Sequence, residues 1–90
     1  MRHAYTPTLT ELQAFVAIAR SGTATAAAHD LGLTQSAVSR SLNGLEVRLG
    51  VALFHRVRKR LLLADAGRTL LRDAERILAD LDASALSVMT

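Results

Sequence analysis

The 90-residue sequence contains no cysteine and no tryptophan, one proline and only three aromatic residues. Without cysteine, disulfides, thiolate chemistry and cysteine-bound zinc are excluded. The scarcity of aromatics beside abundant alanine and leucine favours helices over a β-sandwich. No apolar run approaches the roughly 20 residues of a membrane span, and residues 1–20 lack the basic start and apolar core of a signal peptide. We therefore expect one small, mostly α-helical, soluble domain in the cytoplasm.

Signals for catalysis and metal binding are missing as well. His3, His29 and His55 are too widely spaced to suggest a metal site. The sequence has no nucleophile elbow, no glycine-rich phosphate loop and no paired-carboxylate cleft, and 90 residues leave little room for a pocket. We expect neither an enzyme nor a bound cofactor or metal.

The net charge of +3 is small, but one short segment carries most of it. Residues 51–64 contain Arg56, Arg58, Lys59 and Arg60 with no acidic residue, whereas residues 1–50 carry +1 and residues 65–90 carry −2. A basic segment of this kind is the expected meeting point with an anionic partner. The alternative is a solvated hairpin whose charges only aid solubility.

Start and stop signals divide the first half of the sequence into three helices. Thr8 and Glu11 fit a capping box, in which each side chain binds a backbone N–H of the other residue. The other signals are N-cap threonines and helix-ending glycines, namely Thr23, Thr34, Gly22, Gly32 and Gly50. With apolar residues at helical spacing, they predict helices over about residues 9–21, 24–31 and 35–49.

The third helix begins with TQSAVSR and has an apolar stripe on one side, made by Val38, Leu42, Leu45 and Leu49. At 100° per residue, Ser36, Arg40 and Asn43 lie nearly opposite that stripe. Ser39 lies at the edge of the outer face, and the first turn presents Gln35. The sequence therefore predicts a helix whose polar face points away from the core.

Two short β-compatible segments, Leu53 to Arg56 and Arg60 to Leu63, flank Arg58 and Lys59 and suggest a hairpin. Asp65 is expected to cap a last helix from about Ala66. We thus divide the chain into a flexible N-terminal arm, a winged helix-turn-helix and a linker helix, at residues 1–8, 9–65 and 66–90.

The last helix carries an unusually wide apolar band, made by Leu70, Leu71, Ala74, Ile77, Leu78 and Leu81. So small a domain cannot easily cover both sides of this band, so we expect an exposed stripe that pairs with a second copy. The alternative is that the helix packs on its own domain.

A short helix, a glycine turn and a helix with a polar outer face form a helix-turn-helix, and the basic hairpin makes it winged. The sequence also resembles the N-terminal DNA-binding domain of LysR-type bacterial transcriptional regulators, over about Leu9 to Leu81. The resemblance rests on several motifs that keep their spacing together: FVAIA, T-x-A-A, TQSAVSR, L-x-x-L-E-x-x-L-G-x-x-L-F-x-R, and A-G at the start of the last helix.

This resemblance implies sequence-specific binding of a double-stranded DNA operator. It implies a linker helix that pairs two copies, so that two recognition helices enter successive major grooves of a pseudo-palindromic site. It also implies a tetramer in a full-length protein, nucleoid association when bound, and a small-molecule effector held by a C-terminal domain that this chain lacks. We therefore expect an excised or truncated domain.

The resemblance also assigns roles to single residues. Those expected at base edges in the major groove are Gln35, Ser36, Ser39 and Arg40. Those expected at phosphates are Thr23, Thr25, Thr34, Asn43, Arg58, Lys59 and Arg60. Arg56 matches a wing arginine that reaches the minor groove. The chemistry agrees, because glutamine pairs bidentately with adenine and arginine with guanine.

The chain departs from the family pattern at several places. Asn43-Gly44 stands where longer, often basic residues are common, and Ala24 replaces a common aromatic. Arg58 replaces a small turn residue, and Ala64-Asp65 replaces a common Thr-Pro.

Two other functions compete with this interpretation. One is a winged helix of another regulator class, such as the molybdate-dependent regulators, although the ungapped wing disfavours it. The other is a helical protein-interaction module whose functional surface is the leucine-rich last helix. Such a module has no need of Gln35, Ser39 and Arg40 on an outer helical face.

Overall fold

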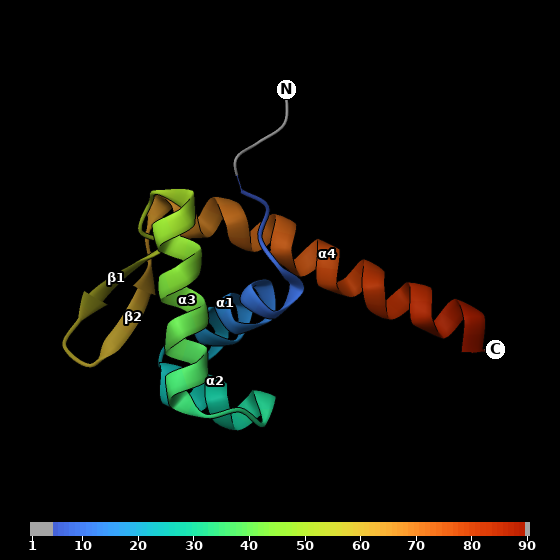
Figure 1. The fold of residues 1–90 in the computed structure, drawn as a ribbon, viewed down its shortest axis with the longest axis horizontal. Helices are drawn as coiled ribbons and strands as arrows, with labels where there is room; N and C mark the ends of the chain where they lie inside the picture. Colours follow the sequence, from blue (N-terminus) through green and yellow to red (C-terminus); the bar gives the residue numbers. More distant parts are fainter. Residues whose placement is uncertain (1–4, 90) are drawn as a thin grey trace.

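The computed structural model describes residues 5–89, which form helices and one antiparallel hairpin (Figure 1). The elements in order are α1 (Leu9–Ser21), α2 (Ala24–Leu31), α3 (Gln35–Leu49), β1 (Phe54–Val57), β2 (Arg60–Leu63) and α4 (Asp65–Met89). This confirms the predicted mostly α-helical, winged helix-turn-helix fold. The predicted arm at residues 1–8 lies outside the described residues at positions 1–4, as does position 90 of the predicted linker helix.

Local capping interactions define the first three helices as the sequence predicts. The Thr8 hydroxyl accepts from the Glu11 N–H at 3.1 Å, and the Glu11 carboxylate accepts from the Thr8 N–H at 2.8 Å, which completes the capping box. The Thr23 and Thr34 hydroxyls likewise accept backbone N–H groups at 3.1 Å. Left-handed glycines end the three helices, with φ of 86°, 68° and 74° at Gly22, Gly32 and Gly50.

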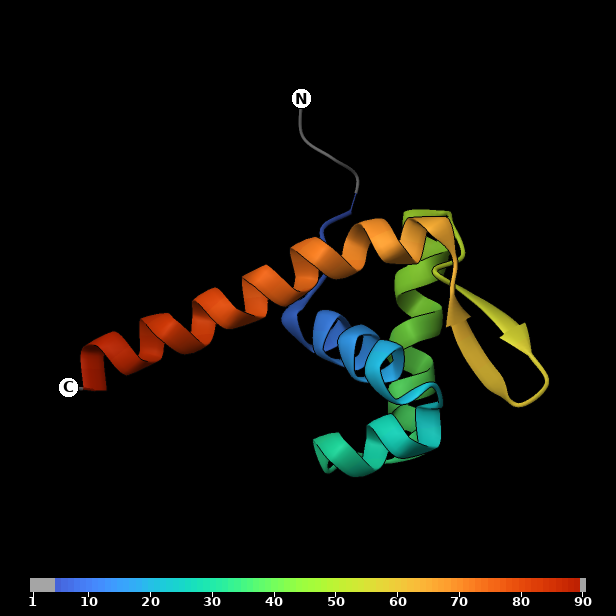
Figure 2. The same cartoon turned by 180° about the vertical axis from the view of Figure 1, so that it is seen from behind.

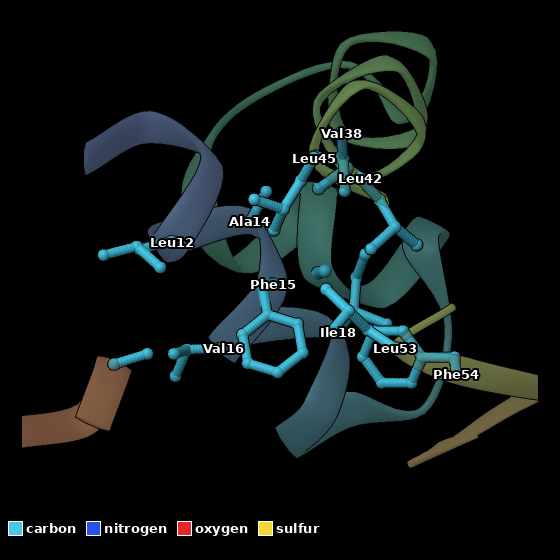
Figure 3. Close-up of a cluster of buried hydrophobic side chains, with 13 residues drawn as sticks. Leu12, Ala14, Phe15, Val16, Ile18, Val38, Leu42, Leu45, Leu53 and Phe54 are labelled. Atoms are coloured by element: carbon cyan, nitrogen blue, oxygen red, sulfur yellow. The ribbon is translucent and has the colours of Figure 1, made fainter. Parts of the chain in front are cut away.

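The core lies where α1, α2, α3 and the start of the hairpin meet (Figure 3). Its largest fully buried side chains are Phe15, Ile18, Leu45, Leu53 and Val38. The Phe15 ring packs on the Phe54 ring with centroids 5.4 Å apart. Because Val38, Leu42 and Leu45 of the apolar stripe of α3 are buried in this cluster, the opposite face of α3 points outward. Leu49, the last residue of the predicted stripe, is exposed.

The hairpin pairs Phe54 with Leu63 and Val57 with Arg60, so that only Arg58 and Lys59 form the turn. The prediction that the first strand begins at Leu53 and ends at Arg56 is wrong by one residue. Leu53 is buried in the core, and its N–H binds the Glu46 carboxylate instead of the opposite strand, so the regular strand begins one residue later. Arg58 has φ of 58°, a left-handed conformation that costs free energy in a residue with a side chain.

The start of α4 differs from the prediction in its cap. The Ala64 carbonyl accepts the Arg68 N–H at 3.0 Å, which places the cap at Ala64. Asp65 is the first helical residue, and its carboxylate pairs with the Arg68 guanidinium instead of a backbone N–H. The first turn of α4 thus begins directly after β2.

Gly67 explains the A-G motif that opens this helix. A Cβ at this position would overlap the Leu53 carbonyl oxygen and lie 2.9 Å from a Leu63 methyl carbon. Only glycine allows α4 to approach the start of the wing this closely.

The predicted dimerisation band of α4 is partly used inside the single chain. Ala74 has no exposed surface, so its assignment to a dimer contact is wrong. Leu70, Leu71 and Leu78 are half-buried against the same core. Beyond Leu78, every described residue of α4 is exposed, and the helix projects away from the other elements in both views (Figures 1 and 2).

Candidate nucleic-acid interface

A groove with a volume of about 480 Å³ lies between α2, α3 and the hairpin. Its lining comprises Thr23, Ala24, Thr25, Gln35, Ser39, Leu42, Asn43, Arg56, Lys59 and Leu61. Apart from the three apolar residues Ala24, Leu42 and Leu61, the lining consists of hydroxyls, amides and two bases, with no acidic side chain. The basic side chains attract a negatively charged polymer, and the hydroxyls and amides can form hydrogen bonds with its polar groups.

Helix α3 contributes Gln35, Ser39 and Asn43 to this groove. Each of these residues follows the one before it by four positions, so the three side chains form one row along the helix. Ser36 and Arg40 are exposed on the neighbouring row and are not part of the groove lining. The outer face of α3 therefore presents two rows, one facing the wing and one facing away from the core.

Helix α2 contributes Thr23 and Thr25 from its first turn. The Thr23 hydroxyl oxygen accepts the Ala26 N–H, which leaves its own hydrogen available to an outside acceptor. A helix N-terminus with such hydroxyls favours an anion such as phosphate. Thr34, the exposed N-cap of α3, lies outside the groove lining.

The wing contributes Arg56 and Lys59, whereas Arg58 and Arg60 are not part of the lining. The Arg60 guanidinium lies beside Gly22, where a Cβ would collide with it. In addition, the Leu61 N–H donates to the Gly22 carbonyl at 2.8 Å. The middle of β2 is thereby attached to the turn between α1 and α2, which holds the wing beside the N-terminus of α2.

A family model of the bacterial regulatory helix-turn-helix proteins of the lysR family matches residues 9–68, two thirds of the chain. The chain belongs to the lysR family. The HTH-type transcriptional regulator PtxR from Pseudomonas aeruginosa is 42% identical over 80 residues, which cover 89% of this chain and 26% of PtxR. This LysR-type chain thus spans about a quarter of that relative.

Two similar solved structures contain DNA. The crystal structure of the CbnR DBD–DNA complex has a TM-score of 0.82 and 34% identity, covering 91% of this chain and 94% of that one. The BenM DBD/benA site 1 DNA complex has a TM-score of 0.84 and 27% identity, covering 91% and 95%. The chain is therefore the DNA-binding domain of a LysR-type transcriptional regulator. The two competing functions are not favoured by these matches.

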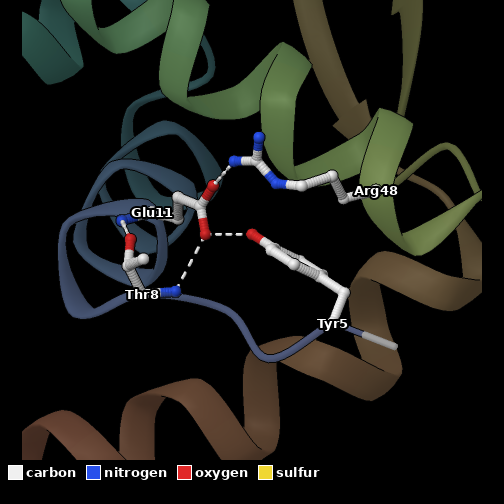
Figure 4. Close-up of polar contacts among 4 residues, drawn as sticks. All are labelled: Tyr5, Thr8, Glu11 and Arg48. Atoms are coloured by element: carbon white, nitrogen blue, oxygen red, sulfur yellow. Dashed lines mark hydrogen bonds and ion pairs between the residues drawn. The ribbon is translucent and has the colours of Figure 1, made fainter. Parts of the chain in front are cut away.

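A polar cluster that the sequence did not predict joins the start of α1 to the last turn of α3 in this LysR-type domain (Figure 4). Glu11, at the start of α1, is nearly buried and accepts from the Thr8 N–H, the Tyr5 hydroxyl and the Arg48 guanidinium. Arg48, near the end of α3, also lies over the Tyr5 ring, 4.8 Å from its centroid. Tyr5 falls within the predicted flexible arm, but these contacts hold it between α1 and α3.

The cluster shifts the pKa values of its members. Burial by itself raises the pKa of the Glu11 carboxyl, but hydrogen bonds from Thr8, Tyr5 and Arg48 outweigh it and hold that pKa below its ordinary value of 4.5. Burial and the hydrogen bond to Glu11 raise the pKa of Tyr5 above 10.0. Glu11 is therefore charged and Tyr5 neutral at neutral pH. Only the capping role of Glu11 has a signal in the sequence, because Arg48 is 37 residues away.

Among residues 5–89, no group of three or more His, Asp or Glu residues is arranged to hold a metal ion. No helix in the same range combines the length and apolar character needed to cross a membrane. Every buried side-chain nitrogen or oxygen there has a hydrogen-bond partner.

Proposed function

We propose that this domain reads an operator by placing the outer face of α3 in the major groove of DNA and the wing at the adjacent minor groove. The observation that carries this proposal is the groove between α2, α3 and the wing. Helices α2 and α3 and the wing all bring polar or basic side chains to it, and its lining contains no acidic residue. A sugar-phosphate strand that passes from the major to the minor groove has the shape and charge to lie there.

In this proposal, both outer rows of α3 read bases. Gln35 and Ser39 do so from the groove side, and Ser36 and Arg40 from the exposed row. Glutamine and arginine each make bidentate pairs with a purine, each worth about 1 to 3 kcal/mol of discrimination. Arg56 enters the minor groove from the wing. The residues proposed to contact phosphates are Thr23, Thr25, Thr34, Asn43, Arg58, Lys59 and Arg60.

We also propose that two copies pair through the part of α4 that stays exposed. Ile77 and Leu81 are about two-fifths exposed and four residues apart, so they form one apolar ridge of α4. Pairing there would cover apolar surface that the domain leaves in water and would present two recognition helices to a pseudo-palindromic site. A tetramer and a small-molecule effector belong to a longer protein.

The role proposed here is binding and regulation, without a catalysed reaction or a cofactor. Because its partner is genomic DNA of a bacterium, we expect the protein in the cytoplasm and at the nucleoid. The proposed division into an arm, a winged helix-turn-helix and a linker helix follows the same logic, since only the middle part lines the groove.

Selection of bound duplexes from a random DNA pool tests this function. The wild-type chain should enrich one motif with two related half-sites. Against that duplex, Gln35→Ala and Arg40→Ala should each lose about tenfold in affinity while binding to unrelated DNA stays near wild type. Arg72→Ala, a change of an exposed base on α4, serves as the control. Failure to enrich any motif would refute the proposal.

Sedimentation tests the pairing. Ile77→Asp should shift the chain towards monomer, because a carboxylate would have to be desolvated in the apolar contact. Val47→Asp places the same charge on an exposed valine of α3 and should leave the equilibrium unchanged. Equal behaviour of the two variants would contradict pairing through α4.

A further inference from the structure

Glu46, in the last turn of α3 and four residues before Gly50, holds the segment that leads into the wing. Its carboxylate accepts the N–H of Leu53 at 2.7 Å. Its backbone carbonyl accepts the N–H groups of Gly50 at 2.9 Å and Val51 at 3.2 Å. One residue of the recognition helix therefore binds the connecting segment at three points, and only one of these bonds uses the side chain.

Leu53 is the residue on which this attachment depends. It is 1% exposed and directly precedes β1. Its N–H binds Glu46 in α3, and its C=O accepts the Ala64 N–H at 2.9 Å, just before α4. The same carbonyl oxygen lies where a Cβ on Gly67, in the first turn of α4, would be. Recognition helix, wing and linker helix thus meet at a single buried residue.

The position of Leu53 determines where the first strand of the wing starts. Arg56 follows three residues later and pairs in register with Leu61, whose N–H is bound to Gly22. The wing is thus attached to the helices at both strands, at Leu61 on the α2 side and at Leu53 on the α3 side. Without the Glu46 carboxylate, the attachment on the α3 side loses its side-chain bond, and a buried N–H is left without its partner.

We infer that Glu46 is a positioning residue, which sets the wing at a fixed place beside α3 and so aligns Arg56 with the Gln35, Ser39 and Asn43 row. This role rests on the proposed function, because it matters only if the wing and α3 contact the same DNA. Glu46 itself is not part of the groove lining, and it acts through the Leu53 N–H.

A double-mutant cycle on the whole chain tests this role, with a duplex selected by the wild type as the probe. Arg56→Ala should lower affinity about tenfold in the wild-type background and less than about twofold in the Glu46→Ala background, since a displaced wing no longer delivers Arg56. Glu46→Gln should behave as wild type, because the amide oxygen can accept the same N–H. Val47→Ala, at the exposed neighbouring position, is the control.

Amide hydrogen exchange provides a second measurement. Exchange at the Leu53 N–H should accelerate in Glu46→Ala and stay protected in Glu46→Gln. If Glu46→Ala does not fold, Glu46→Asp takes its place in the cycle, because a side chain one methylene shorter does not reach the Leu53 N–H.

Different results would refute the positioning role of Glu46 and the proposed function. If the wild type binds its selected duplex but Arg56→Ala costs the same in both backgrounds, the positioning role is wrong and the proposed function stands. If the wild type enriches no motif, the proposed function fails and the positioning role fails with it.

Discussion

The buried carboxylate of Glu11 offers a test of how the first and third helices are held together. Glu11→Gln keeps the side-chain length and an oxygen that accepts the Thr8 N–H and the Tyr5 hydroxyl. Glutamine is also suitable at this position of a capping box, so the start of α1 is retained. What the substitution removes is the negatively charged Oε2 acceptor that faces Arg48, since the amide NH2 group that replaces it cannot accept a hydrogen bond. It therefore separates the contact with Arg48 from the capping interactions.

The size of the expected loss in stability depends on how far the Glu11–Arg48 pair is buried. The Glu11 side chain is 6% exposed and that of Arg48 is 51% exposed, so solvent screens the attraction from one side only. Loss of the charge-assisted hydrogen bond from Arg48 should lower the free energy of unfolding by about 1 to 2 kcal/mol. In a domain of this size, such a loss corresponds to a fall in Tm of roughly 5 to 15 °C.

The stability that the charged Glu11 carboxylate contributes should depend on pH. The pKa of Glu11 is below its ordinary value of 4.5 in the folded chain, so folding favours the charged form. Its contribution to stability is therefore present above pH 4.5 and is lost as the pH falls through the lowered, folded pKa. Protonated glutamic acid resembles glutamine, so the stability gap between wild type and Glu11→Gln should close in acid.

Thermal unfolding followed by circular dichroism, from neutral pH to below pH 4, measures that gap. Glu75→Gln is the matched control, because Glu75 is 44% exposed and pairs with the exposed Arg20 across 3.4 Å. An exposed pair of this kind should contribute less than about 1 kcal/mol. A gap that stays constant with pH, or one no larger than that of Glu75→Gln, would refute the reasoning.

Three further outcomes follow from the wing and its junction with α4. Gly67→Ala should lower the free energy of unfolding by about 2 to 3 kcal/mol in a denaturant titration, because its methyl group would overlap the Leu53 carbonyl; a neutral effect would show that α4 can shift. Arg58→Gly should stabilise the chain by up to about 1 kcal/mol, since glycine tolerates the φ of 58°, and should weaken DNA binding at low salt. Lys59→Ala should reduce the slope of log affinity against log salt by about 0.9 if Lys59 neutralises one phosphate, and an unchanged slope would remove it from the contact set.

Local signals predicted the helices of this domain well. Thr8 with Glu11, Thr23 and Thr34 bind backbone groups within three residues of themselves, and the glycines adopt their left-handed conformation within the same turn. Such capping interactions involve only neighbouring residues, so the local sequence is enough to predict them. The predicted bounds of the first three helices agree with the structure for this reason.

The errors occur where a residue serves a distant element. Leu53 has the composition of a strand residue, but the carboxylate of Glu46 binds its N–H and the core buries its side chain. Ala74 fits the apolar band of α4, but packing on the domain core removes it from the surface. Asp65 has the chemistry of a cap, yet Ala64 occupies that position. In each case a contact formed in the folded chain outweighed the local pattern.

The sequence by itself determined the helices, the basic segment and the polar outer face of α3, because caps, charge and helical periodicity are properties of neighbouring residues. Only the tertiary structure decided which of the candidate residues share a surface. It brought Thr25, Gln35, Asn43, Arg56 and Lys59 to one groove and left Ser36 and Arg40 on the adjacent row. That selection depends on the packing of α2, α3 and the wing around one core, and no residue's immediate neighbours specify it.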